Sequence, residues 1–157
     1  MYVWGEGKFG QLGLGKERMT YIPDPTCLDI DVNLKLLDVK AGFRQSYIIT
    51  EQNQVLCCGS NKSLELGRET EEGIIASPIV LDLAGIMKQK IVKLSTGQRH
   101  VVVMDSAGDL YGWGDNKYGQ LGSMSEKKKA YTLVKLGIEK IREVSCGWNH
   151  TLALSGM

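Results

Sequence analysis

The sequence predicts an all-β protein made of three tandem copies of one unit. A first motif is centred on Gly5, Gly59 and Gly114, and a second on Gly42, Gly97 and Gly147. Both motifs return with one period of about 50 residues, a spacing typical of repeat folds. Glycine is also enriched, at 19 of 157 residues, as a chain with many tight turns requires. We therefore expect copies at 1–53, 54–107 and 108–157, joined in one structural domain.

Each copy contains short apolar runs that are typical of strands. One run, 101–104, follows the second motif, and the polar turn 105–109 separates it from the next run. Runs rich in β-branched residues and bounded by Gly, Asn or Asp indicate antiparallel strands joined by hairpins. We expect strands at 2–4, 26–30, 36–41, 45–50, 54–58, 78–82, 91–96, 99–105, 109–113, 131–135, 141–146 and 149–155. One short helical turn is expected at 84–90.

The spacing of these strands predicts a partial β-propeller, because four strands in about 50 residues make one propeller blade. Trp4 and Trp113 are expected to pack between neighbouring blades, and Cys58 takes the place of the ring in the middle copy. A glycine follows each of these positions because the chain must turn sharply at the strand end. In the middle copy Leu64 replaces a glycine of the outer loop, so we expect that loop to follow a different path.

The residues shared by the copies are interpreted as structural positions. They are Trp4, Gly5, Gly10, Gly13, Gly42, Gly59, Gly67, Gly97, His100, Trp113, Gly114, Gly119, Gly122, Gly147 and His150. His100 and His150 occupy one place in two copies, and Gln45 occupies it in the first. A nucleophile or a metal ligand is expected once, beside its base or further ligands, whereas a structural hydrogen bond recurs. Both histidines are therefore predicted to be structural.

The repeated string resembles a known family. Trp-Gly-x-x-x-x-Gly-Gln-Leu-Gly, followed by a strand that starts with Gly-x-x-His, is similar to the regulator of chromosome condensation repeat over nearly the whole chain. Cys58, Leu64 and Glu65 depart from the pattern in the middle copy. The resemblance implies a propeller of the seven-bladed kind, in which each blade begins at the strand before Gly-x-x-His. On that phasing the chain holds about three blades: 36–82 and 91–135 are complete, 2–30 is an outer half and 141–155 is an inner half.

So few blades do not close a normal propeller ring, since closure takes about four to eight. Three explanations stay open. The chain is a fragment or short isoform of a longer propeller, or it is an open array whose edges are covered by other protein. In the third explanation, two chains join their half blades head to tail into a six-bladed ring, which is a homodimer with closed symmetry.

Charge and composition argue against several classes of partner. Lys and Arg number 19 and Asp and Glu 18, a net charge of +1, whereas a nucleic-acid-binding protein needs a strongly basic face. Nucleic acid is therefore not an expected partner. The longest apolar run, 101–104, is far shorter than the ~20 residues that cross a membrane. The N-terminus lacks a signal-peptide pattern, and we expect a cytoplasmic or nuclear protein, or one present in both compartments.

The sequence offers no pattern typical of a catalytic or metal site. Its four cysteines have no zinc-site spacing, and we expect buried free thiols in a reducing compartment. They are Cys27, Cys57, Cys58 and Cys146. The segment 10–16 matches part of a phosphate-binding loop, but Glu17 stands where Ser or Thr would hold Mg²⁺. We expect no metal, no cofactor and no enzymatic activity.

The sequence favours a non-catalytic module that binds other proteins through a rigid propeller face. The alternative, implied by the family resemblance, is a guanine-nucleotide exchange factor for a Ran-like small GTPase. Loops at a propeller rim commonly bind partners, and the charged runs 69–72 and 126–129 fall in predicted loops. We expect Lys127, Lys128 and Lys129 to form a loop that meets an acidic protein partner.

Overall fold

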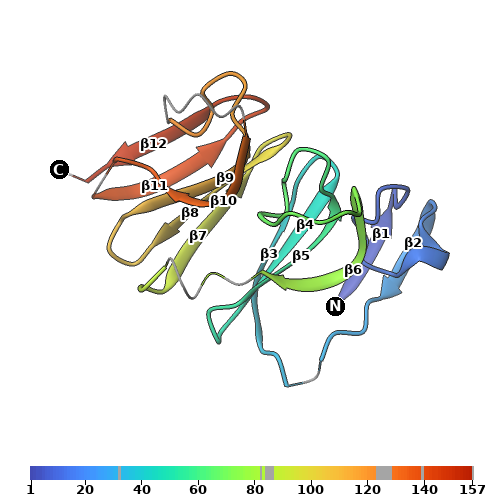
Figure 1. The fold of residues 1–157 in the computed structure, drawn as a ribbon. Helices are drawn as coiled ribbons and strands as arrows, with labels where there is room; N and C mark the ends of the chain where they lie inside the picture. The colour runs from blue at the N-terminus through green and yellow to red at the C-terminus, as the bar shows by residue number, and fades with distance from the viewer. Residues whose placement is uncertain (32, 82, 84–86, 123–128, 139, 157) are drawn as a thin grey trace. The chain divides into compact units, whose positions relative to one another are not determined.

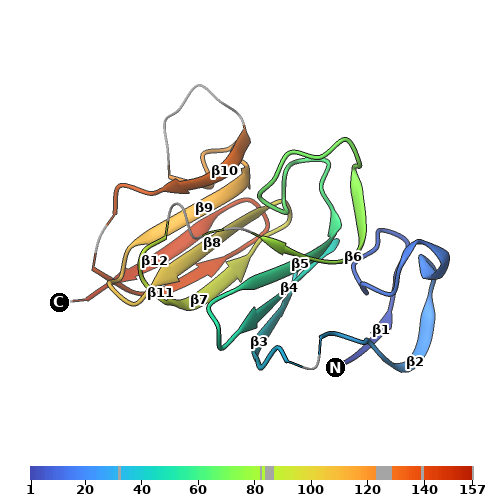
Figure 2. The same cartoon turned by 60° about the horizontal axis from the view of Figure 1, so that its bottom comes forward.

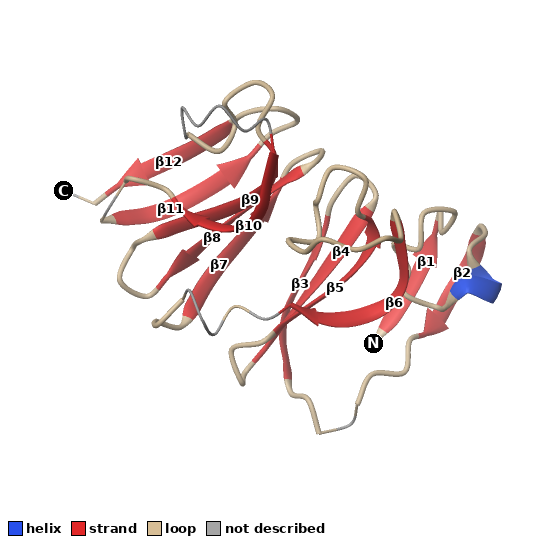
Figure 3. Ribbon diagram, viewed as in Figure 1, coloured by secondary structure: helices blue, strands red, loops and turns tan. Residues whose placement is uncertain are grey.

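The computed structural model of the chain describes residues 1–31, 33–81, 83, 87–122, 129–138 and 140–156, and only the backbone of 129–134. The elements in this part of the chain are strands, apart from one short 3₁₀ turn, η1 (Lys16–Arg18) (Figure 3). None of these residues forms a helix of the length and hydrophobicity that a membrane crossing takes. The chain divides into two compact units, Met1–Lys62 with Thr70–Asp82, and Ser63–Glu69 with Leu83–Met157. We call them the N-terminal and C-terminal units.

The N-terminal unit holds a four-stranded antiparallel sheet and a two-stranded one (Figure 1). The strands of the larger sheet follow one another in chain order: β3 (Leu36–Ala41), β4 (Gln45–Thr50), β5 (Val55–Ser60) and β6 (Ile74–Leu81). The smaller sheet pairs β1 (Tyr2–Gly5) with β2 (Ile22–Cys27). This is the arrangement expected of one complete blade and the outer half of another.

The C-terminal unit repeats the pattern in a different combination. Its four-stranded sheet runs β7 (Ile91–Thr96), β8 (His100–Asp105), β9 (Leu110–Asp115) and β10 (Lys129–Lys135). Its two-stranded sheet pairs β11 (Ile141–Cys146) with β12 (Thr151–Ser155). The register is also shared, because Gln45 lies opposite Gly59 in β4–β5 and His100 lies opposite Gly114 in β8–β9. The predicted phasing into two complete and two half blades is confirmed.

The observed strands differ from the prediction mainly where proline occurs. β2 covers Ile22–Cys27 and includes Pro23 and Pro25, so the predicted strand at 26–30 is wrong beyond residue 27. β6 begins at Ile74, four residues before the predicted start, and includes Pro78. Both strands lie at sheet edges, where a proline displaces no ladder hydrogen bond. The helical turn expected at 84–90 falls partly outside the described residues, which omit 84–86.

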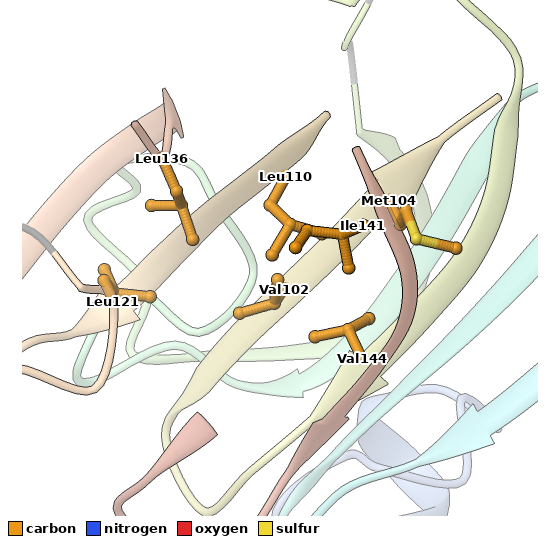
Figure 4. Close-up of a cluster of buried hydrophobic side chains, with 7 residues drawn as sticks. All are labelled: Val102, Met104, Leu110, Leu121, Leu136, Ile141 and Val144. Atoms are coloured by element: carbon orange, nitrogen blue, oxygen red, sulfur yellow. The ribbon is translucent and has the colours of Figure 1, made fainter. Parts of the chain in front are cut away.

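The core of the C-terminal unit lies between its two sheets. Alternate residues of β8 point to opposite faces of the sheet, and Val102 and Met104 face β11, where Ile141 and Val144 meet them. Leu110, Leu121 and Leu136 complete this cluster (Figure 4). Side chains of β8 and β11 therefore pack together in the apolar contact between one blade and the next.

Candidate functional site

The second motif folds into the same closed turn in every copy. The amide of Gly97 donates to the carbonyl of His100 at 2.9 Å, and Gly147 donates to His150 at the same distance. In the first copy the amide of Gly42 donates to the carbonyl of Gln45 at 2.8 Å. In each turn this hydrogen bond joins the first and fourth residues, and the two residues between them lie at the tip.

The first motif folds into a loop in which a backbone amide donates a hydrogen bond to a side-chain oxygen. Gln11 Oε1 accepts the amide of Phe9 at 2.9 Å, and Gln120 Oε1 accepts the amide of Tyr118 at 2.9 Å. In the middle copy Glu65 Oε2 accepts the amide of Ser63 at 2.7 Å. Glutamate therefore replaces glutamine without loss of the acceptor that shapes the loop.

The expectation of a different loop path in the middle copy is wrong. Leu64 has φ 63°, beside 75° for Gly10 and 77° for Gly119. The amide of Gly67 donates to the carbonyl of Leu64 at 3.0 Å, as the equivalent amides do in the other copies. The left-handed conformation costs a leucine about 1–2 kcal/mol, and burial of the Leu64 side chain offsets this cost.

The carbonyl at the Gln/Glu position of each loop is held by a strand that follows it in the chain. Gln11 O accepts the hydroxyl of Ser46 at 2.7 Å, and Gln120 O accepts the hydroxyl of Thr151 at 2.7 Å. Glu65 O accepts the indole N–H of Trp113 at 2.5 Å. The loops are therefore rigid supports for the side chains around them.

The two tryptophans of the first motif have different surroundings. Trp113 is fully buried, with 0% exposure, and the loop of the middle copy covers it through Glu65. Trp4 is 59% exposed, so the expectation that it packs between blades is wrong for this chain. The loop that covers Trp113 belongs to the preceding copy, and no loop of the described residues takes that place over Trp4.

His100 is buried in the C-terminal unit. Its Nε2 lies 3.0 Å from Thr151 Oγ1, whose own proton goes to Gln120 O, so Nε2 is the nitrogen that carries the ring proton. The pKa of His100 is lowered to about 4, chiefly by burial, while the nearby charge of Asp115 acts in the opposite direction. Gly97 lies against the ring, where an added Cβ would collide. His150 occupies the equivalent turn but is exposed.

The cysteines and the glycine-rich segment form no metal or phosphate site in the described part of the chain. Cys57 and Cys58 are buried, and burial raises the pKa of Cys58 to about 12. Cys27 is exposed and Cys146 half-buried, so the prediction of buried thiols holds for two of the four. The amides of Gly10, Gly13 and Gly15 donate to backbone carbonyls and are not arranged as a phosphate cradle. The described residues include no group of His, Cys, Asp or Glu that could hold a metal ion.

Aromatic and cationic side chains gather on the turns and loops of both units. In the N-terminal unit, the Arg44 guanidinium lies 3.8 Å from the ring centroid of Phe9 and 4.8 Å from that of Phe43. We call these three residues the N-terminal rim. Phe43 and Arg44 are the two middle residues of the closed turn, and Phe43 is exposed. Stacking of this kind holds an arginine in place while its N–H groups still face outward.

The C-terminal unit presents a related set, the C-terminal rim, which consists of Arg99, Lys117, Tyr118 and Trp148. The Lys117 ammonium lies 5.2 Å from the ring centroid of Tyr118, and Trp148 is 59% exposed. The two turns that carry Arg99 and Trp148 are neighbours, because the amide of Gln98 donates to the carbonyl of Trp148 at 3.1 Å. The rims fall at the variable positions of the repeated motifs, which the sequence analysis did not single out.

The predicted lysine loop is not part of either rim. Lys127 and Lys128 lie outside the described residues, and Lys129 begins β10, of which only the backbone is described at that point. In the acidic run, Glu72 pairs with Lys16 at 2.8 Å, and both side chains are exposed. A pair in this position is worth about 0–1 kcal/mol. The lysine loop stays a prediction.

The repeats of this chain match the models of a known family. A model described as the regulator of chromosome condensation (RCC1) repeat matches residues 1–49 and 107–154, and a second model of this repeat matches 91–120. The chain is 30% identical over 159 residues to the ultraviolet-B receptor UVR8 of Arabidopsis thaliana, which covers 99% of the chain and 34% of the receptor. It is 32% identical over 166 residues to the mouse serine/threonine-protein kinase Nek9, covering 98% of the chain and 17% of the kinase.

Solved structures show the same fold. Human WBSCR16 superposes with a TM-score of 0.83 and 25% identity, covering 99% of the chain and 40% of that protein. Prp20p of Saccharomyces cerevisiae superposes with a TM-score of 0.84 and 20% identity, covering 97% of the chain and 38% of that protein. The chain thus spans well under half the length of the proteins that it matches.

Proposed function

Because the chain belongs to the regulator of chromosome condensation (RCC1) repeat family and has the fold of a partial propeller of that type, we propose that it is a non-catalytic module that binds another protein. The binding surfaces in this proposal are the N-terminal and C-terminal rims. Turns held by repeated hydrogen bonds present both rims, and a buried scaffold of β-strands supports them. Rigid scaffolds with variable loops are common binding surfaces.

One observation carries the proposal: aromatic rings and cations, exposed or half-buried, lie together at equivalent turns and loops. Aromatic residues and arginine are the types most enriched at protein interfaces and among their energetic hot spots. Arg44 is already ordered by Phe9 and Phe43, so less conformational entropy is lost when it binds a partner. The cations Arg44, Arg99 and Lys117 favour a partner surface that carries carboxylates.

Related proteins support a protein partner without identifying it. Prp20p is described with binding properties to Gsp1p and histones, and the yeast RCC1 protein is described bound to Kap60. These binding partners are described for those proteins, and the similarity of those proteins to this chain shows a shared fold. They are consistent with a propeller face that binds protein.

Affinity capture from cell extract tests the proposal. The wild-type chain, Arg44→Ala and Trp148→Ala are used as baits, and bound proteins are quantified by mass spectrometry. Val80→Ala and Val92→Ala are matched controls, because both remove an exposed apolar side chain from a strand. We expect at least one protein to bind the wild type and both controls, and to lose about tenfold or more of its binding with a rim variant. Equal capture by all five baits would contradict the proposal.

Guanine-nucleotide exchange on a Ran-like small GTPase is the second candidate function. It finds support in the family and in the likeness to Prp20p, which is described with binding to Gsp1p. The test is release of a fluorescent guanine nucleotide from Ran, measured with and without the chain. Faster release at substoichiometric amounts of chain would establish exchange. A release rate unchanged by excess chain would leave binding as the function.

A further inference from the structure

The N-terminal rim holds one arginine against two aromatic rings. The loop that follows β1 carries Phe9, and the turn between β3 and β4 carries Phe43 and Arg44, so the three meet at one end of the unit (Figure 2). The Arg44 guanidinium lies 3.8 Å from the ring centroid of Phe9 and 4.8 Å from that of Phe43. Rings at such distances attract a guanidinium through their π faces. The side chain of Arg44 is therefore ordered before any partner binds.

Hydrogen bonds fix the backbone beneath these side chains. The amide of Arg44 donates to Gln45 Oε1 at 2.8 Å, and its carbonyl accepts the amide of Ser60 at 2.8 Å. The amide of Phe9 donates to Gln11 Oε1 at 2.9 Å. Because Gln45 is buried in the sheet, the turn that carries Arg44 is anchored to a rigid support.

The charge of Arg44 has no counterpart in the described part of the chain. Lysines there form five ion pairs with carboxylates, whereas Arg44 forms none with a described residue. Arg44 is half-buried, and water screens such a cation less than a fully solvated one. A guanidinium presents its N–H donors in a planar fork that matches the two oxygens of a carboxylate. The chemical group that this site fits is therefore a carboxylate.

The other two copies show that the fold does not require this set of side chains. The turn closes with the same hydrogen bond in every copy, from Gly42, Gly97 or Gly147. The positions of Phe9, Phe43 and Arg44 hold different residues in the other copies: Ser63, Gln98 and Arg99 in the second, and Tyr118, Trp148 and Asn149 in the third. The first copy alone combines an arginine with two rings, so the combination is not a requirement of the repeat.

Phe43 leaves apolar surface beside the guanidinium. Its side chain is 45% exposed. Trp148 at the same position of the third copy is 59% exposed, although its carbonyl accepts the amide of Gln98 from the neighbouring turn. Exposure at this position therefore persists when a neighbouring turn is in place. A partner that brings a carboxylate to Arg44 also comes close to the Phe43 ring, which favours an apolar residue beside the acidic one.

We propose that the N-terminal rim binds a partner segment in which an aspartate or glutamate stands next to an apolar or aromatic residue. This inference rests on the proposed function and adds the chemistry of the partner. The carboxylate accepts N–H groups of Arg44 in a bidentate pair, and the neighbouring side chain packs on Phe43. Because the two rings already order the guanidinium, little of its conformational entropy is lost on binding. Arg44 is then the residue of this rim on which affinity depends most.

Selection from a random peptide library tests the chemistry of the partner. Phage-displayed peptides are selected on the wild-type chain and, in parallel, on Arg44→Ala. We expect the wild type to enrich peptides that have an acidic residue next to an apolar one, and Arg44→Ala to lose this enrichment. Enrichment of the same peptides on both chains, enrichment of peptides without an acidic residue, or no enrichment on the wild type would overturn the proposal.

Dissociation constants of one enriched peptide test the contact itself. Arg44→Ala should weaken binding about 30-fold or more, as loss of a hot spot does. Arg44→Lys keeps the charge without the planar fork and should weaken it about tenfold or more. Arg18→Ala is the matched control, because it removes an exposed arginine of η1, outside the rim, and it should bind like the wild type. Circular dichroism and urea unfolding check that each variant is folded.

A double-mutant cycle identifies the group that Arg44 contacts. Replacing the acidic residue of the peptide by its amide should weaken binding to the wild type about tenfold or more, and should change binding to Arg44→Ala little. Equal losses on both chains would overturn the pairing, and tighter binding of a phosphoserine version of the peptide would overturn carboxylate as the ligand.

The proposed function and this inference fail in different ways. A peptide whose binding depends on Trp148 and not on Arg44 would overturn the inference and leave the proposed function standing. Both fail together only when neither rim affects the capture of any protein or peptide.

Discussion

Truncation of Trp113 measures how strongly the loop of the middle copy is joined to the sheet that follows it. The indole is fully buried and its N–H donates to Glu65 O at 2.5 Å. Replacing a buried Trp by Ala costs about 3–5 kcal/mol, and the lost hydrogen bond accounts for about 1 kcal/mol of such a change. We therefore expect Trp113→Ala to lower the free energy of unfolding by about 4 kcal/mol.

Urea unfolding followed by circular dichroism is the assay. With an m-value of about 2 kcal/mol/M, a loss of about 4 kcal/mol moves the midpoint down by about 2 M. Trp113→Phe keeps most of the apolar volume and removes the donor, so a smaller shift is expected. Trp148→Ala is the matched control, because this tryptophan is 59% exposed, and its midpoint should change by less than about 0.5 M. A Trp113→Ala midpoint equal to that of the control would refute the reasoning.

Three further predictions concern the buried histidine, two loop glycines and two cysteines. Burial lowers the pKa of His100 to about 4 from 6.5, so the unfolded chain takes up a proton there before the folded one does. The free energy of unfolding should therefore be highest above pH 6.5 and lower by about 2 kcal/mol at pH 5. Urea unfolding at both pH values should show that His100→Gln removes this difference. Gly119→Ala should lower the free energy of unfolding by about 1 kcal/mol, because the residue has a positive φ. Gly10→Ala should lower it by more, since the added Cβ would also lie 2.9 Å from a backbone atom of β6. Thermal unfolding compares the two variants, and equal losses would contradict this reasoning. Iodoacetamide should label Cys27 quickly and Cys58 only after unfolding, as peptide mass spectrometry can show.

The repeat period predicts most of the fold, because the sheets are built from pairs of strands that every copy contains. Most strands follow from the two motifs and the apolar runs beside them, and the phasing of the blades follows from the family resemblance. The outer strand β2 was less predictable, since Pro23 and Pro25 are poor strand formers except at an edge, and edge position is a property of the assembled sheet. Leu64 shows the same limit, because tertiary packing holds it in a backbone conformation that its own propensity disfavours.

The candidate site was only partly predictable. The motifs place two residues at the tip of each turn, but the exposure of Trp148 and the stacking of Arg44 on Phe9 depend on neighbouring loops. The exposure of Trp4 likewise depends on a neighbour rather than on its motif. In the sequence, the charged runs suggested a binding loop. In the structure, aromatic side chains at the variable positions of the motifs distinguish these turns.

The left-handed leucine of the middle copy has a consequence for recognising distant relatives. The family models leave residues 50–90 unmatched, yet this stretch contains β5 and β6 of a complete sheet. Once a packed side chain stabilises the bend, mutation can erase the glycine signature while the blade survives. Motif counts in such proteins therefore give a minimum number of blades, and diverged members can hide whole blades between recognisable ones.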